Sequence, residues 1–290
     1  MNKSFTLIEI LVVIVVIGVL SAFILVGMTS ITNSANITKS KTFSNSIRNS
    51  LLTNLVSEWK LDGNANDSWG ANSGTLVGPT HLPVLKTTND CVSGTCYEFD
   101  GTEDYISIGD KDNLSFTDNI FTFSVWFKLY TNNNLGILGK RGAPWEYSIF
   151  TRTANIMRCY TWVSSGASAI YSASTAIETN KWTHLVWTSD GSKAYLYKNS
   201  LYVGSVNKTS DNLSNTTSPF EIGRGGDASG YQCMNGLLDE VTIYNGYSSS
   251  SQIRESFYSG INKLYKNKGI SLNEFNQRLA ELKSDLVNNE

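Results

Sequence analysis

The sequence has few histidines and no large excess of positive or negative charge. Its 290 residues include two histidines, His81 and His184, whose separation fits neither one helical face nor a metal-ligand motif. The sequence therefore offers few residues for histidine-based acid–base catalysis or for zinc binding. The 23 basic and 25 acidic residues give a net charge of −2, so no electrostatic footprint indicates nucleic acid or an anionic membrane surface.

Cysteine is also scarce, with four residues that form an even set. Cys91 and Cys96 bracket the short segment CVSGTC, whose glycine lets it close on itself. Cys159 and Cys233 would have to meet across the fold. We expect disulfides outside the cell; the alternative is four thiols in a reducing compartment.

The N-terminal segment combines an apolar run with a helical periodicity. Residues 10–28 contain no charged side chain, and Glu9 stands directly before them. A four-residue spacing of apolar side chains then continues through the polar part that follows, at Phe43, Ile47, Leu51 and Leu55. This pattern predicts a long helix over 5–58, whose stretch 10–28 can span a bilayer.

Three interpretations of this segment differ in how they treat Glu9. A cleaved secretory signal would have an unusually short basic region, and no A-x-A-like site follows the apolar run. A plain membrane anchor fits the apolar length, with Lys3 favouring an N-terminus inside the cell. Neither explains a carboxylate at the edge of a membrane span, which costs on the order of a few kcal/mol.

The third interpretation rests on SFTLIEILVVIVVIGVLSA, which resembles the class III signal of type IV pilins and pseudopilins. The resemblance implies that residues 1–4 are a leader, that prepilin peptidase cuts between Ser4 and Phe5, and that the new N-terminus is methylated. Ser4 departs from the family, which usually has glycine before the cut. Glu9 becomes the fifth mature residue, which in this family pairs with the terminal amino group of a neighbouring subunit.

From residue 59 to 258 the apolar pattern changes to a period of two. In FTFSVWFKLY, one set of side chains faces one way and the other set faces the opposite way: Phe121, Phe123, Val125, Phe127 and Leu129 against Thr122, Ser124, Lys128 and Tyr130. Asp100-Gly101 and Asp190-Gly191 are turn dipeptides between strand-like runs. The predicted fold class is α+β: a long N-terminal helix, an antiparallel β-sandwich and a C-terminal helical tail.

The order of the sequence blocks in 59–258 resembles the laminin-G-like, concanavalin A-type jelly roll. Among these blocks are SEWKLDGNANDSWGANSGTL, YEFDGTEDYISIGDKDNLSF, NKWTHLVWTSDGSKAYLYKNSLYVGSV and MNGLLDEVTIYNGYSSSSQIRESFY. The resemblance implies two antiparallel sheets packed face to face and a lectin-like binding scaffold rather than a reaction.

Calcium is the expected metal. The loop NANDSWGANSG supplies Asp67, Asn72 and the carbonyl of Gly70 for a hard cation with oxygen ligands. The jelly-roll resemblance implies calcium in many members and adds Asp239, near the last strand. The alternative is that Asp67 caps a turn and that Asp239 is a rim residue.

One motif has the spacing of a hydrolase. Glu98, Asp100 and Glu103 match the E-x-D-x-x-E pattern of laminarinase-type glycoside hydrolases, whose outer carboxylates act as nucleophile and acid/base. Both must project from one strand into one cleft. Because Asp100-Gly101 predicts a hairpin turn, Glu103 is expected past the turn and away from Glu98. We therefore expect a binding protein that is not an enzyme.

Two tryptophans in loop-like segments are candidate ligand contacts: Trp69 in DSWGAN and Trp145 in RGAPWEY. Each can stack on a sugar; the alternative for each is a plug over the core. Trp59, Trp126 and Trp182 fall in strand-like blocks and are expected inside the domain.

Residues 259–290 predict a helical tail. Apolar side chains recur at alternating three- and four-residue steps, at Leu272, Phe275, Leu279, Leu282 and Leu286. Ser271 and Glu274 form a capping-box signature. The tail faintly resembles short oligomerisation tails of bacterial proteins; the alternative is a helix that covers its own domain.

The function predicted from these features is a structural subunit of a type IV pilus-like filament that displays a lectin-like domain for adhesion or partner binding. Before assembly the subunit would lie in the cytoplasmic membrane, with its N-terminus inside, and afterwards in an extracellular homo-oligomer. Its expected partners are prepilin peptidase, the assembly machinery and a glycan or surface ligand. The alternatives are a minor pseudopilin of a type II secretion or DNA-uptake system, and a membrane-anchored carbohydrate-binding protein that does not polymerise.

Overall fold

The computed structural model describes residues 46, 49–50, 52–131, 134–142, 145–152, 156–163, 168–171, 175–208, 213–227 and 230–288. The chain divides into two compact units, Met1–Asn49 and Ser50–Glu290. The predicted span 10–28 and the positions Ser4, Phe5 and Glu9 lie outside the described residues. In the part of the chain that is described, no helix has both the length and the apolarity needed to cross a bilayer.

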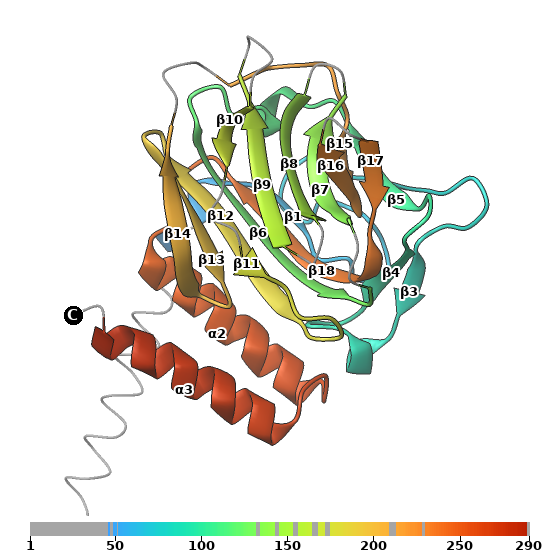
Figure 1. Ribbon diagram of the computed structural model, residues 1–290. Coiled ribbons are helices and arrows are strands. Elements are labelled where there is room, and N and C mark those ends of the chain that lie inside the picture. Colours follow the sequence, from blue (N-terminus) through green and yellow to red (C-terminus); the bar gives the residue numbers. More distant parts are fainter. Residues whose placement is uncertain are drawn as a thin grey trace, which may run out of the picture. The chain divides into compact units, whose positions relative to one another are not determined.

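The second unit is an antiparallel β-sandwich with two C-terminal helices (Figure 1). Sheet A has the spatial order β14 (Leu201–Asn207), β13 (Lys193–Lys198), β12 (Thr183–Asp190), β6 (Ile120–Leu129), β18 (Asn235–Tyr244), β4 (Cys96–Asp100) and β3 (Val84–Lys86), with β1 (Leu55–Trp59) also paired to β18. Sheet B has the order β10 (Ser168–Tyr171), β9 (Ile156–Trp162), β8 (Trp145–Arg152), β7 (Gly136–Arg141), β15 (Phe220–Ile222), β5 (Tyr105–Gly109) and β2 (Thr75–Val77), with β11 (Thr175–Ala176) on β9.

Six further elements complete the unit outside the two sheets. The strands β16 (Arg224–Asp227) and β17 (Gly230–Cys233) form a separate hairpin, and η1 (Thr88–Asp90) and η2 (Asp112–Leu114) are single 3₁₀ turns. The C-terminal helices are α2 (Ser250–Lys266) and α3 (Leu272–Asn288). The predicted boundary between residues 258 and 259 therefore falls inside α2.

The core lies between the sheets and is rich in aromatic rings. Alternate side chains of β6, β8 and β12 point inward, so Phe123, Ile149 and Trp187 are fully or almost fully buried. The rings of Phe123 and Trp187 stack with centroids 5.7 Å apart. The apolar period of two read from FTFSVWFKLY is therefore the inner face of β6.

The polar face expected of β6 is not exposed, which corrects the one-sided strand predicted from the sequence. Thr122 and Ser124 are 1% and 6% exposed, because α2 covers the outer face of sheet A. The Thr122 hydroxyl lies 2.6 Å from that of Thr188, and Ser124 Oγ lies 2.8 Å from Nε2 of His184. Thr122 and Ser124 therefore find polar partners there and are buried without being left unpaired.

The predicted helix over 5–58 ends before 58. Ser46, Asn49, Ser50 and Leu52 are helical, but Leu55–Trp59 form β1, paired with β18. The pairing buries Trp59 completely, and its indole Nε1 donates to the carbonyl of Asn72 at 2.9 Å. Burial of this ring overrides the four-residue spacing that placed Leu55 on the helix.

The helical tail packs on its own domain. Helix α2 begins at a capping box in which Ser249 Oγ accepts the N–H of Gln252 and the Gln252 side chain accepts the N–H of Ser249. Phe257, Ile261 and Leu264 of α2 are buried against Trp126 of β6 and Trp182, which directly precedes β12. In α3, Ser271 Oγ accepts the N–H of Glu274, as the capping signature predicted.

Candidate functional site

A cleft of about 770 Å³ opens where the β2–β3 loop, the β4–β5 turn and the β16–β17 hairpin meet. Its lining residues are Val77, Gly78, Pro79, Gly101, Thr102, Glu103, Tyr105, Asn134, Arg224, Gln232 and Cys233. Volumes of this order are typical of ligand sites, which occur in concave regions with a few convergent polar groups. Among the described residues, this is therefore where we place the candidate functional site.

The cationic wall of the cleft is Arg224. Its guanidinium carbon lies 4.1 Å from the centroid of the Tyr105 ring, and its Nε lies 3.1 Å from Oε2 of Glu221. The ring and the buried carboxylate fix the guanidinium plane, which lowers the entropy lost when a ligand binds to it. Arg224 also offsets the charge of Glu221.

The anionic wall is Glu103, carried by the β4–β5 turn. Asp100 Oδ1 accepts the backbone N–H of Thr102 at 2.7 Å and its hydroxyl at 2.6 Å, and Gly101 takes a φ of 87°. Glu103 Oε1 then accepts the N–H of Thr80 at 3.0 Å and its hydroxyl, joining the turn to the β2–β3 loop. The turn thus presents a carboxylate in a set position.

Behind this turn lies Asp104, which is 1% exposed. Its two carboxyl oxygens lie 3.0 and 3.2 Å from the backbone nitrogen of Asp100, which donates to them. Burial raises the pKa of Asp104 to about 7, and the neighbouring Asp100 carboxylate adds to the rise. The protonation of this buried acid therefore changes in the neutral range.

The cleft offers a guanidinium, a carboxylate, a hydroxyl, amides and an aromatic ring edge to one ligand. Gln232 adds a buried Oε1 that has no hydrogen-bond partner within the described residues. Because Arg224 and Glu103 carry opposite charges, the wall does not select strongly for a charged ligand. This mixture suits a neutral molecule with many hydroxyl groups, each able to donate and accept.

The E-x-D-x-x-E carboxylates do not share this cleft. Glu98 pairs with Lys86 and lines a second, smaller hollow of about 420 Å³, whereas Glu103 lines the cleft. The hairpin turn expected at Asp100-Gly101 is present and separates them. The structure thus does not bring the outer pair together across one ligand position, as a retaining glycosidase requires.

Of the residues predicted to bind calcium, Asp67, Gly70 and Asn72 lie in the loop between β1 and β2, and Asp239 lies in β18. Asp67 accepts four backbone N–H groups, from Glu58, Trp69, Gly70 and Asn72. Since a carboxylate has about four lone-pair positions, its capacity is filled by the turn. In this conformation the Asp67 carboxylate caps the turn, as the alternative interpretation had it.

Asp239 is committed elsewhere. It is fully buried, and it accepts the N–H groups of Val92, Ser93 and Glu240. Burial raises the pKa of Asp239 well above its ordinary value, and the nearby Glu240 carboxylate adds to the rise. No cluster of three or more His, Cys, Asp or Glu side chains suited to a metal occurs in the described ranges. Calcium binding stays a prediction, and a calcium titration followed by thermal unfolding checks it.

The two candidate tryptophans differ in their surroundings. Trp69 is 51% exposed at the tip of the Asp67 turn, so its loop position is confirmed. Trp145 begins β8 rather than a loop and is half-buried, with its ring 5.3 Å from that of Trp162 in a T-shaped contact. The loop expected around Trp145 is therefore wrong, because β8 pairs with β7 from that residue on.

One of the two predicted disulfides is present. Cys91 and Cys96 are bonded, with Cα atoms 5.5 Å apart. The pairing of Cys159 with Cys233 is wrong: both are thiols. Cys159 faces the core between the sheets, whereas Cys233 lies on β17, in the hairpin that packs near Ser148 on the outer face of sheet B. Burial raises the pKa of the Cys233 thiol to about 11.

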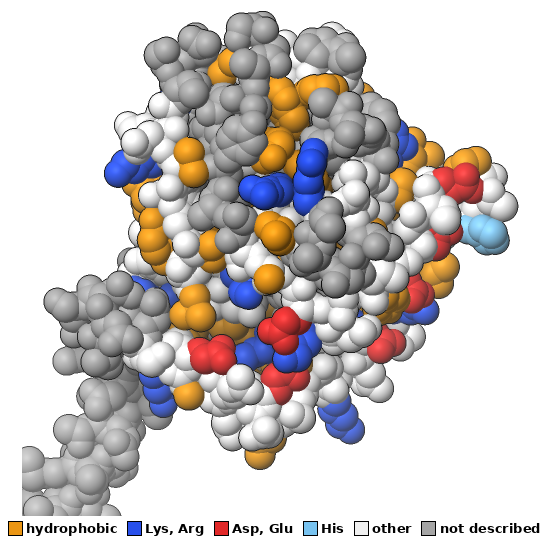
Figure 2. Space-filling view, viewed as in Figure 1, with side chains coloured by type: hydrophobic (Ala, Val, Ile, Leu, Met, Phe, Trp, Pro, Cys, Tyr) orange, Lys and Arg blue, Asp and Glu red, His pale blue; other side chains and the backbone are white. Residues whose placement is uncertain are grey.

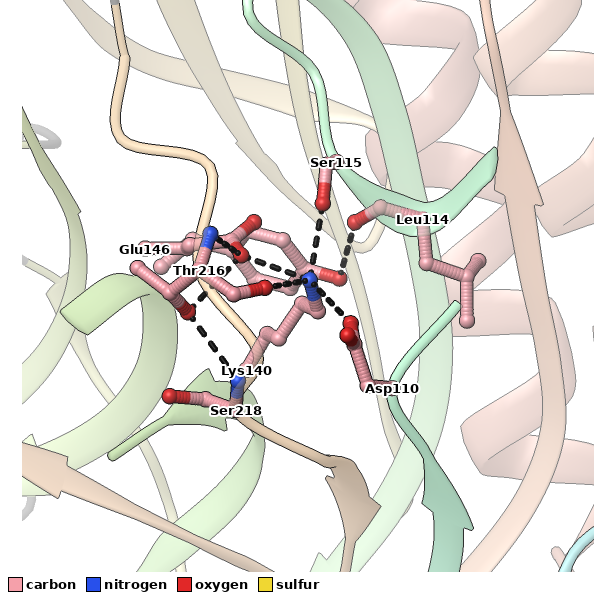
Figure 3. Close-up of polar contacts among 8 residues, drawn as sticks. Asp110, Leu114, Ser115, Lys140, Glu146, Thr216 and Ser218 are labelled. Carbon is pink, nitrogen blue, oxygen red and sulfur yellow. Dashed lines mark hydrogen bonds and ion pairs between the residues drawn. The ribbon is translucent and has the colours of Figure 1, made fainter. Parts of the chain in front are cut away.

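Nothing in the sequence indicated a buried lysine near the C-terminal end of β7. Lys140 is completely buried, and its Nζ lies 2.6 Å from Oε1 of Glu146 and 2.9 Å from Oδ1 of Asp110 (Figure 3). It also donates to the hydroxyl of Ser115 and the carbonyl of Thr216. The one available signal is register, since Lys140 pairs with two inward-facing aromatic residues, Tyr147 and Phe220. This cluster joins the η2 loop, β7, β8 and the segment before β15.

Comparison with known proteins confirms both resemblances. Residues 100–254 match the family model of the concanavalin A-like lectin/glucanases superfamily, and residues 1–25 match the prokaryotic N-terminal methylation motif. No curated protein matches the chain.

Solved structures share the fold at low identity. One is the binding domain of Paraclostridial Mosquitocidal Protein 1, with 17% identity and a TM-score of 0.60 over 73% of this chain and 53% of that chain. Another is domain 4 of AbnA, an extracellular arabinanase of Geobacillus stearothermophilus, in complex with arabinotriose, with 20% identity and a TM-score of 0.53 over 70% and 97%. A third is botulinum neurotoxin type C, described as interacting with two ganglioside molecules, with 12% identity and a TM-score of 0.55 over 73% and 53%. The chain thus spans about half the length of the first and third of these.

Proposed function

Because the chain belongs to the concanavalin A-like lectin/glucanases superfamily and begins with a prokaryotic N-terminal methylation motif, we propose that it is a type IV pilus-like filament subunit that displays a saccharide-binding domain. The observation that carries the proposal is this pairing on one chain. The motif supplies a route to membrane insertion, processing and assembly. The domain supplies a surface to be displayed.

The proposed route uses three residues of the N-terminal segment. Prepilin peptidase removes residues 1–4 by cutting between Ser4 and Phe5, and the new amino group is methylated. The chain stays in the cytoplasmic membrane, with the domain outside, until its apolar helix joins the filament core. There Glu9 pairs with the terminal amine of a neighbouring copy, since a carboxylate in apolar surroundings requires a positive partner.

The proposed ligand is a neutral saccharide, bound in the cleft without hydrolysis. Its hydroxyls would accept from Arg224 and donate to Glu103 and to Oε1 of Gln232, and these three groups come from different elements. Arabinotriose bound to domain 4 of AbnA and gangliosides bound by the neurotoxin support saccharides as the ligand class for a domain of this shape. The separation of Glu98 from Glu103 supports binding without catalysis.

Ligand binding is tested by titrating the full chain in detergent with a panel of neutral oligosaccharides that includes arabinotriose. Glu103→Gln is expected to weaken binding about 10-fold, which is about 1.4 kcal/mol, because one charged acceptor becomes a neutral amide. Glu178→Gln is the matched control, since Glu178 is exposed and outside the cleft. Equal affinities of the Glu103→Gln variant and the unaltered chain would reject the cleft.

Assembly is tested with Glu9→Ala, expressed in a host that has a pilus assembly system. Membrane insertion should be unchanged and surface filaments should be lost, while Glu103→Gln should form filaments normally. Normal filaments from Glu9→Ala would reject the proposed pairing. Incorporation of the chain in low copy number, at the filament tip alone, would indicate a minor pseudopilin. A mature chain that retains residues 1–4 and never assembles would indicate a membrane-anchored binding protein.

A further inference from the structure

A rigid turn keeps the side chain of Trp69 exposed to solvent. Its side chain is 51% exposed, while Asp67 accepts four backbone N–H groups from the residues around it. The turn is also tied to β1, because the Ser68 hydroxyl donates to the Glu58 carbonyl at 3.0 Å. A Cβ on Gly70 would lie 2.5 Å from the carbonyl oxygen of Val56, so the turn sits directly on the strand. The backbone that carries the indole is therefore fixed before any partner arrives.

The residues next to Trp69 are small, so its ring projects from the surface and does not form the wall of a pocket. Ser68, Gly70 and Ala71 are small and exposed, and neither the cleft nor the smaller hollow is lined by Trp69. Small ligands are bound in concave sites, whereas a projecting tryptophan on a rigid support is typical of an anchor that fills a pocket on a protein partner. The shape thus favours a protein partner over a sugar.

A hollow that fits an indole occurs on this same chain. It has a volume of about 420 Å³ and lies beside β3, at the edge of sheet A. Leu82 and Val84 on its rim are 51% and 53% exposed, and the buried ring of Phe99 lines it. Figure 2 shows hydrophobic and acidic side chains next to one another along the edge that carries β3, β4 and β5.

The hollow also meets the polar requirement of an indole. A buried tryptophan needs an acceptor for its N–H, and the Glu98 and Asp100 carboxylates line the hollow. The hollow thus complements an indole in two ways. Its apolar rim can pack against the ring, and its carboxylates can accept the indole N–H.

The projection and the hollow lie at opposite ends of one strand. Asn235 at the start of β18 lines the hollow, and Thr242 near its end pairs with Glu58, the residue to which the Trp69 turn is tied. Seven residues of strand separate them by about 20 Å. Two complementary features at separate places on one surface make a heterologous contact, which repeats into an open chain instead of closing as a pair.

We propose that Trp69 of one copy inserts into the hollow beside β3 of the next copy, so that the globular domains join head to tail. The contact rests on the proposed function only in that a filament would use it. It adds a domain-to-domain contact to the assembly proposed for the N-terminal helix and does not involve the saccharide cleft.

Cross-linking tests the contact in the full chain, in membranes and after detergent extraction. Ala71→Cys, two residues from Trp69, and His81→Cys, next to Leu82 in the lining of the hollow, leave Trp69 and the apolar rim in place. The two are combined in one chain and treated with a short bis-maleimide. The expected result is a ladder of dimers, trimers and longer products. The two single variants, which share the Cys159 and Cys233 thiols of the parent, should give no ladder. A double variant without a ladder overturns the proposal, and a product that stops at dimers overturns the open chain.

A second comparison keeps the test independent of the cysteines. Trp69→Ala and Val84→Arg should each lower self-association of the extracted chain at least 10-fold, and the double variant should lose no more than either single one, because both remove one contact. Tyr202→Ala, at a ring that is 53% exposed elsewhere on sheet A, is the matched control and should associate normally. Normal association of Trp69→Ala, or weaker oligosaccharide binding by it, overturns the proposal.

The outcomes separate this contact from the proposed function. Filaments formed equally by the unaltered chain and by Trp69→Ala would overturn the contact and leave the filament role standing. A cross-linked ladder in membranes from a chain that never forms filaments would support the contact and reject the filament role.

Discussion

The two sides of this sandwich are held in different ways. The outer face of sheet A is covered by α2 and α3, whose apolar side chains turn it into a second core around Trp126 and Trp182. On the side of sheet B, loops and the β16–β17 hairpin are joined by charged and hydrogen-bonded groups, including the Lys140 cluster and the pair of Arg224 with Glu221. One side is closed by burial and the other is held by polar contacts.

We infer from this difference that the helix-covered side serves stability and the polar side serves ligand recognition. Apolar packing is non-directional and excludes water, so it suits a face that binds nothing. Polar contacts fix loops while leaving hydrogen-bonding groups at the surface, which suits the walls of a cleft. Three perturbations test this division, two on the helix-covered side and one on the polar side.

The largest effect is expected on the polar side, from Lys140→Ala. It leaves Glu146, which is 1% exposed, without its positive partner, and breaking a buried ion pair costs about 3–5 kcal/mol. Urea unfolding of the variant measures the loss. Lys181→Ala is the control, because the Lys181–Glu178 pair is exposed to water and should contribute little to stability. Similar losses from the two variants would mean that the Lys140 cluster is not what holds these loops.

The second effect is acid sensitivity beneath the helices. His184 is fully buried, its ring packs nearly parallel to those of Trp126 and Phe257, which also stack on each other, and burial lowers its pKa to about 3. Because the folded pKa lies below the unfolded value of about 6.5, the neutral imidazole stabilises the fold fully above pH 6.5 and progressively less as the pH falls toward 3. The contribution of His184 to the free energy of unfolding should drop by about 3 kcal/mol between pH 7 and pH 4.

The two histidines of the chain provide a matched pair for this test. His184→Gln should remove the loss, whereas His81→Gln, at an exposed position, should retain it. Asp104 acts in the opposite direction, since its raised pKa of about 7 makes the fold more stable as the pH falls from 7 toward 4. The difference between the two variants therefore isolates the imidazole. A pH profile unchanged by His184→Gln would show that the helices do not seal this group from water.

The smallest effect concerns how closely α2 approaches sheet A. A Cβ on Gly260 would lie 2.3 Å from the ring of Trp126, so Gly260→Ala should destabilise the fold by about 1–3 kcal/mol. At an exposed helical site the same change stabilises by roughly 0.5–1 kcal/mol, so the sign of the effect decides. Ser259→Ala, exposed on the same helix, is the control and should be close to neutral. A stabilised Gly260→Ala would indicate a loose helix.

The sequence predicted the elements whose signals are local. The period of two over Phe121–Leu129, the turn at Asp100-Gly101 and the Ser271 cap each depend on neighbouring residues, and each is present. The CVSGTC disulfide is equally local. The two family resemblances added the sandwich and the methylation motif.

The features that were missed depend on residues far apart in the chain. Whether Thr122 is exposed depends on α2, and whether Cys159 can reach Cys233 depends on which face of sheet B each occupies. Lys140 lies in GILGKR, where nothing local distinguishes a buried lysine from an exposed one. The cleft likewise unites Glu103 with Arg224 through the position of the β16–β17 hairpin, which the sequence alone did not show.

The pairing of β1 with β18 has a consequence for how the domain is made. The first strand of the sandwich cannot pair until the last one has been made, because Glu58 of β1 pairs with Thr242 of β18. Strand β18 also lies between β6 and β4 at the centre of sheet A. Contacts between such distant parts of a chain form slowly and late. Sheet A therefore cannot close until translation has passed Tyr244, and most of the polypeptide has to be synthesised, and moved to wherever it folds, before its core exists.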